Sequence, residues 1–186
     1  MAIITKMLTL DVFLKLPETK PASEYINGEI IQKPIPQGEH SRLQAKLCES
    51  INQAAESQKL AYAFPELRCT FGGESIIPDV AVFRWGRIPR QDSGRVANRF
   101  NIYPDWSIEI LSADQSQTKV LGNLLHCSQH GSELGWLIDP AEESVLIIFP
   151  EQRVQLLSKS AFLPVLSGIN LEFTVRQFFN WLTFSS

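Results

Sequence analysis

The chain has 186 residues, of which 44% are hydrophobic and 20% are charged, and its formal net charge is −3. This length suits one domain spanning residues 1–186, and the composition is typical of a soluble globular protein. The negative charge gives no overall sign of nucleic-acid binding, and no apolar run approaches the roughly 20 residues that a membrane-spanning helix needs.

The N-terminus does not have the pattern of a signal peptide. Lys6 and Asp11 interrupt its apolar run, and no small-residue cleavage site follows. The three cysteines (Cys48, Cys69 and Cys127) are an odd number without C-x-x-C spacing, which argues against a disulfide framework and a zinc knuckle. We therefore expect a cytoplasmic protein with free thiols and no membrane partner.

The first third of the chain predicts two helices and a hairpin. Thr9 is a suitable N-cap for a short helix over residues 10–16, which Pro17 ends. Asn27-Gly28 lies between two apolar runs, which is a strong signal for a β-hairpin over residues 23–31. After a connector with two prolines, apolar residues recur every four positions and predict a helix over residues 39–57.

The remainder of the chain alternates strands with helices. We expect strands over residues 61–70, 75–83 and 106–111, then a helix over 115–130 with Gly131 as its C-cap. A buried strand over 134–138 and a meander over 144–157 follow, and Thr174 opens a capping box for a last helix. This order predicts a mixed α/β domain with a central sheet flanked by helices.

Two acids interrupt apolar strands and are the first candidates for chemistry. Asp79 follows Pro78 and falls on the face opposite Val80 and Val82, while Glu109 lies between two isoleucines. A buried carboxylate is costly unless it is paired or binds a cation. Two carboxylates from strand ends suit Mg²⁺ or Mn²⁺, which would activate a water for phosphodiester hydrolysis. Strand-edge acids that face water are the structural alternative.

Two basic features accompany these acids. Lys119 lies in the first turns of the helix after Glu109, where it would assist the water or face solvent. Five arginines (Arg84, Arg87, Arg90, Arg95 and Arg99) occupy the loop that joins the acidic strands. We expect this loop beside the site, where its arginines would contact a DNA backbone and Trp85 would stack on a base. A solvated loop with internally paired arginines is the alternative.

These motifs, in their order, resemble the Uma2 family (DUF820) of restriction-endonuclease-like proteins, which is expanded in cyanobacteria and belongs to the PD-(D/E)XK nuclease superfamily. The resemblance rests on Pro78-Asp79, on Ile108-Glu109-Ile-Leu-Ser112 and, most distinctively, on Trp136-Leu-Ile-Asp-Pro140. The hairpin Glu24-Tyr-Ile-Asn-Gly-Glu29 and His40 at the start of the long helix add to it. It covers nearly the whole chain.

The resemblance implies a three-layer α/β/α fold in which Asp79 and Glu109 bind Mg²⁺. The superfamily lysine two residues after the glutamate is Leu111 here, and Asn123 occupies a position where many relatives carry lysine. Lys119, one helical turn away, is therefore the catalytic candidate. Accessory candidates, which a superfamily site often takes from the first helical region, are Glu24, Glu39 and His40, with Asn123 on the later helix.

Two functions from different classes follow. The first is a Mg²⁺-dependent DNA endonuclease that hydrolyses phosphodiester bonds and that we expect to be a homodimer; the aromatic residues Phe173, Phe178, Phe179 and Trp181 would form an interface or, as the alternative, pack a C-terminal helix into the core. The second is a catalytically decayed nuclease-fold module that binds nucleic acid or protein, for which the missing lysine at position 111 and the net negative charge speak.

Overall fold

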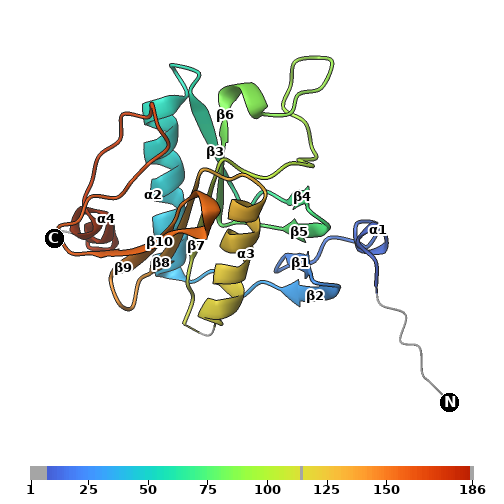
Figure 1. The fold of residues 1–186 in the computed structure, drawn as a ribbon, viewed down its shortest axis with the longest axis horizontal. Helices are drawn as coiled ribbons and strands as arrows, with labels where there is room; N and C mark the ends of the chain where they lie inside the picture. Colours follow the sequence, from blue (N-terminus) through green and yellow to red (C-terminus); the bar gives the residue numbers. More distant parts are fainter. Residues whose placement is uncertain (1–7, 114, 185–186) are drawn as a thin grey trace.

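A central six-stranded sheet organises the chain (Figure 1). The structure is a computed structural model that describes residues 8–113 and 115–184; residues 1–7, on which the signal-peptide interpretation partly depends, lie outside this part. The strand order is β10-β9-β8-β7-β6-β3. The bounds are β3 Ala61–Pro65, β6 Val80–Arg84, β7 Trp106–Ile110, β8 Leu134–Asp139, β9 Ser144–Ile148 and β10 Val154–Ser158.

All neighbouring strands of this sheet are antiparallel except β7 and β8. These two run parallel because helix α3 (Gln117–Gln129) carries the chain back between them. The prediction of this helix is confirmed, and Gly131 follows it with a φ of +112°, a left-handed conformation that glycine adopts readily. The sheet is therefore mixed, and it forms the centre of the mixed α/β domain that the sequence predicted.

One face of the large sheet packs against helix α2 (Gly38–Ala55) and the C-terminal segment that contains α4 (Val175–Phe179). The predicted apolar stripe of α2 is confirmed, because Leu43, Leu47 and Ile51 are fully buried. Burial of such a side chain stabilises the fold by about 1.5–3 kcal/mol relative to exposure. Figure 1 shows the strands of the large sheet between α2 and α3, so the fold has three layers.

The opposite face is covered by α3 and a four-stranded sheet in the order β2-β1-β5-β4. Its strands are β1 Ser23–Ile26, β2 Glu29–Gln32, β4 Cys69–Phe71 and β5 Glu74–Ile76. At the β1–β2 turn, Asn27 and Gly28 have φ angles of 51° and 84°, as a two-residue hairpin requires. The short helix α1 (Leu10–Phe13) precedes this sheet, and the Thr9 side chain accepts the Val12 N–H at its start.

Two strands that the sequence predicted as continuous are each divided between the two sheets. Residues 61–70 supply β3 to the large sheet and β4 to the small one, while residues 75–83 supply β5 and β6. Pro78 lies at the second break, because a proline has no N–H to donate to a strand ladder. This break leaves Asp79 at the start of β6, where the two sheets meet.

The C-terminal aromatic residues belong to the core. Phe173, Phe178 and Phe179 are buried, and Trp181 packs against the same cluster. The capping box of α4 is confirmed, with Thr174 accepting from Gln177 N–H. These side chains are therefore not the dimer surface for which they were candidates. Within residues 8–113 and 115–184, none of the helices has the length and apolar character to cross a membrane.

Candidate metal centre

Asp79, the residue just before β6, and Glu109 of β7 are neighbours where these two strands pair. In the antiparallel pairing of β6 with β7, Val80 lies opposite Ile108, so the preceding Asp79 faces the following Glu109. The alternation of a strand directs Ile108 and Ile110 toward α2 and Glu109 toward α3. Both acids are buried, with Asp79 3% and Glu109 1% exposed. The two carboxylates are therefore neighbours in the fold, and a shared metal site stays a prediction.

The backbone and helix α2 fix the Asp79 carboxylate. Its Oδ2 accepts the Ile110 N–H at 2.8 Å, and His40 Nε2 lies 3.0 Å from the same oxygen. Gln44 Nε2 donates to the Asp79 carbonyl at 2.8 Å. Because His40 and Gln44 lie one helical turn apart on α2, a single face of this helix holds Asp79 in place.

Lys33 provides the positive charge of the site. This residue follows β2, and its Nζ lies 2.8 Å from Asp79 Oδ1 and 3.5 Å from Glu109 Oε2. It also donates to the Ile77 carbonyl at 2.5 Å. Its side chain is only 12% exposed. The sequence interpretation missed Lys33, because it lies in the connector between the hairpin and α2, where a lysine is ordinarily solvated.

A third carboxylate, from the small sheet, lies beside this group. Glu24 is 5% exposed, and its Oε1 accepts the Ile77 N–H at 2.7 Å. Asn123 of α3 donates to Glu24 Oε2 at 3.3 Å. The accessory candidates Glu24 and Asn123 are therefore brought together, and they connect α3 and β1 to the segment just before Asp79.

The buried charges of the site do not cancel. The three carboxylates of Glu24, Asp79 and Glu109 face the single ammonium of Lys33, which leaves two negative charges when all four groups are ionised. Burial raises the pKa of Glu109 well above its usual range, and Asp79 and Glu24 raise it further, against the attraction of Lys33. Burial likewise raises the pKa of Glu24, although Lys33 lowers it in part.

Asp79 behaves in the opposite way. Burial alone would raise its pKa, but the Lys33 ammonium and the contact with His40 hold the pKa below the usual range. Burial would lower the pKa of Lys33, yet Glu109, Asp79 and Glu24 keep it above its ordinary value. The centre therefore contains a firmly ionised Asp79 and a Glu109 whose ionised form Lys33 compensates only in part.

The donor atoms fit a divalent cation that prefers oxygen. Glu109 Oε1 is buried and has no hydrogen-bond partner in the described part of the chain, which is costly for an ionised oxygen. Among residues 8–113 and 115–184, no three His, Cys, Asp or Glu side chains converge as a metal-ligand group. Asp79 and Glu109 supply two carboxylates, and an ion such as Mg²⁺ keeps several waters and needs only one or two carboxylates.

The remaining predicted site residues lie outside this group. Lys119 is exposed, and it lines a cavity of about 310 Å³ that Glu24, Lys33 and Asn123 also line. Glu39 is exposed on the first turn of α2. Leu111 immediately follows β7, and it packs against the core between α3 and the large sheet.

The arginine-rich loop lies at the other end of the large sheet, so the prediction that it flanks the acids is wrong. The loop leaves β6 at Arg84 and returns to β7 at Asp105, whereas Asp79 and Glu109 lie at the opposite ends of these strands. At about 3.3 Å per residue, β6 alone separates the two places by roughly 15 Å. Figure 1 shows the loop at the top of the view and the N-terminus of α3 at the bottom.

Two of the five arginines are engaged in ion pairs within the chain. Arg84 Nη2 donates to Glu133 Oε2 at 2.7 Å, and Arg87 Nη1 donates to Asp105 Oδ1 at 2.5 Å. The guanidinium of Arg90 lies 5.8 Å from the ring centre of Trp85. The alternative interpretation of internally paired arginines therefore holds for part of this loop. Arg95 and Arg99 are exposed.

Comparisons with known proteins agree with this architecture. The family Uma2, described as "Putative restriction endonuclease", matches residues 10–176. A crystal structure of a protein from Anabaena variabilis, described as a putative nuclease belonging to DUF820, shares 53% sequence identity with a TM-score of 0.93. The alignment covers 95% of this chain and 99% of that one. No curated protein matches the sequence. On these grounds the chain belongs to the Uma2 family and has its nuclease-like three-layer fold.

Proposed function

We propose that this protein is a divalent-metal-dependent DNA endonuclease whose centre consists of Asp79, Glu109 and Lys33. The observation that carries the proposal is the buried pair of carboxylates with an ammonium 2.8 Å from one and 3.5 Å from the other. A stability role alone would favour apolar residues here, since a buried ion pair is a weak source of stability. The family, described as "Putative restriction endonuclease", and the Anabaena variabilis protein, described as a "putative nuclease", support the same reaction class.

Asp79 and Glu109 would hold Mg²⁺ or Mn²⁺, through the unpartnered Glu109 Oε1 and an oxygen of Asp79. When bound, such an ion lowers the pKa of a coordinated water and neutralises charge on a phosphodiester. His40 and the Ile110 N–H keep Asp79 oriented for this task, because both contact its Oδ2.

Lys33 supplies the basic group that the superfamily pattern places at position 111. Its ammonium already lies beside both carboxylates, and Lys33 lines the 310 Å³ cavity from which a phosphate oxygen can approach. We assign to it the stabilisation of negative charge on the phosphodiester. Lys119 lines the same cavity and is exposed, so we assign to it a contact with the DNA backbone rather than with the reacting atoms.

The position of Arg95 and Arg99 makes them outlying candidates for DNA contact. They belong to a loop roughly 15 Å from the acids by strand length, so they would contact a duplex several phosphates from the site of cleavage. A homodimer and a cytoplasmic location stay predictions.

The test is cleavage of supercoiled plasmid by the purified full chain. We expect nicked and linear products with 5 mM MgCl₂ or MnCl₂, and none with EDTA. Electrophoretic shift of the same DNA in EDTA serves as the companion measurement. DNA binding without cleavage under any metal condition would contradict the nuclease proposal. It would support a catalytically decayed DNA-binding module, which is the function that leucine at position 111, in place of the superfamily lysine, favours.

A further inference from the structure

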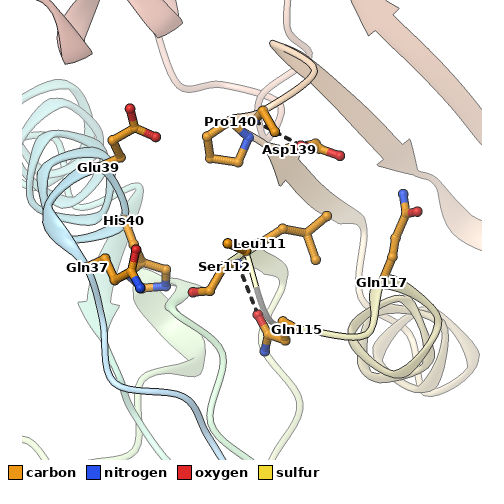
Figure 2. A pocket seen from close by; sticks show the side chains of 11 residues that line it. Gln37, Glu39, His40, Leu111, Ser112, Gln115, Gln117, Asp139 and Pro140 are labelled. Atoms are coloured by element: carbon orange, nitrogen blue, oxygen red, sulfur yellow. Dashed lines mark hydrogen bonds between the residues drawn. The ribbon is translucent and has the colours of Figure 1, made fainter.

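A second cavity, of about 310 Å³, adjoins the candidate metal centre beyond His40 (Figure 2). Its volume is at the lower end of the range for small-molecule sites. The walls come from the start of α2, the segment after β7 and the turn after β8. Its lining residues include Gln37, His40, Leu111, Ser112, Gln117 and Pro140.

This cavity combines apolar walls, uncharged hydrogen-bonding groups and two acids. Leu111 and Pro140 supply apolar surface, while Gln37, just before α2, and Gln117, the first residue of α3, lie at its margin (Figure 2). No lysine or arginine lines it, and Glu39 and Asp139 do. Phosphate is therefore disfavoured here and belongs to the neighbouring cavity that contains Lys33 and Lys119.

Two buried polar atoms at this cavity lack a partner among the described residues. They are Nδ1 of His40 and Oγ of Ser112. His40 is 7% exposed, and its other ring nitrogen lies 3.0 Å from Asp79 Oδ2. One imidazole thus connects the metal centre to the cavity. A ligand that hydrogen-bonds in this cavity would lie next to the group bound at Asp79.

We propose that this cavity receives a nucleobase of the DNA strand, next to the phosphodiester at the metal centre. This proposal rests on the proposed function, because the nucleobase would belong to the DNA that the metal centre cleaves. A base needs apolar surface against its faces and donors or acceptors at its edge, which is how enzymes hold an extruded base. Leu111 and Pro140 supply the first requirement, and the glutamine amides with Ser112 supply the second.

The experiment is an NMR titration of the metal-free full chain with deoxyadenosine, deoxycytidine and 2-deoxyribose 5-phosphate. We expect saturable shifts of the Gln37 and Gln117 side-chain amide signals with at least one nucleoside and none with the sugar phosphate. In the double variant Gln37→Ala/Gln117→Ala, the nucleoside affinity falls about tenfold, as the loss of two hydrogen bonds predicts. The control Gln129→Ala, at an exposed position on α3, keeps the affinity of the unmodified chain.

The absence of saturable shifts, equal shifts with the sugar phosphate, or an unchanged affinity in the double variant would each overturn this assignment. The readout does not depend on cleavage. Nucleoside binding in a chain that never cuts plasmid would contradict the nuclease proposal alone, whereas plasmid cleavage without nucleoside binding would contradict the base cavity alone.

Discussion

Replacement of Lys33 by methionine is expected to lower the free energy of unfolding by about 3–5 kcal/mol at pH 8, the usual cost of removing one partner from a buried charge group. The methionine keeps the length of the side chain but leaves Asp79 and Glu109 without their ammonium. Urea denaturation followed by tryptophan fluorescence measures this loss, since Trp106 and Trp136 are fully buried in the core.

The loss should depend on pH in a defined direction. In the unmodified chain the lowered pKa of Asp79 contributes stability above the unfolded pKa of aspartate, and this contribution disappears as pH falls toward the folded value. The raised pKa values of Glu109 and Glu24 act oppositely, because their ionisation destabilises the fold as pH rises. Without Lys33 the contribution of Asp79 shrinks to what His40 supports, and the destabilisation by ionised Glu109 and Glu24 grows. The difference between variant and unmodified chain therefore widens from pH 4 to pH 8.

Lys46→Met is the matched control, because Lys46 pairs with Glu49 on the exposed face of α2. Such surface pairs contribute at most about 1 kcal/mol. A Lys33→Met variant as stable as this control at pH 8 would show that the buried charges are not coupled as described.

Glu109→Gln is expected to reduce plasmid cleavage at least about a thousandfold, equivalent to about 4 kcal/mol of transition-state stabilisation. The amide keeps the volume of the side chain but removes the negative charge that would hold the ion. Because burial already opposes the ionisation of Glu109, the same change should leave the melting temperature unchanged or raise it at pH 8. Loss of activity without loss of stability separates a metal ligand from a structural residue.

Asp79→Asn should abolish cleavage to the same degree but with some loss of stability, since Asp79 also accepts from Lys33 and Ile110. Glu49→Gln, an exposed acid on α2, is the control that keeps full activity. Cleavage by Glu109→Gln at the rate of this control would exclude Glu109 from the reaction.

The sequence was sufficient to predict that Asp79 and Glu109 lie close together, because local rules of strand structure determine their positions. Pro78 ends one strand, and alternation places Glu109 on the face opposite its isoleucine neighbours. The same rules miss Lys33, which comes from the other sheet and lies 46 residues before Asp79. Its role depends on how the hairpin packs against the large sheet, and no local pattern encodes that packing.

The arginine loop shows the complementary error. Residues 84–105 join the two acidic strands, but the strands are antiparallel and the acids lie at the ends away from the loop. Adjacency in sequence therefore led to the wrong prediction that the loop lies beside Asp79 and Glu109. Strand direction relative to each acid would have corrected this, because Asp79 immediately precedes β6 and Glu109 lies near the end of β7.

The central claim is that Asp79 and Glu109 share a divalent cation. Crystals of the full chain soaked in MnCl₂, with diffraction data collected at a wavelength where manganese scatters anomalously, test it most directly. We predict an anomalous peak bonded to one carboxylate oxygen of each acid, with Glu109 Oε1 as a ligand, and no such peak in Glu109→Gln crystals. Manganese bound only elsewhere, or no peak at this place in well-diffracting soaked crystals, would contradict the account.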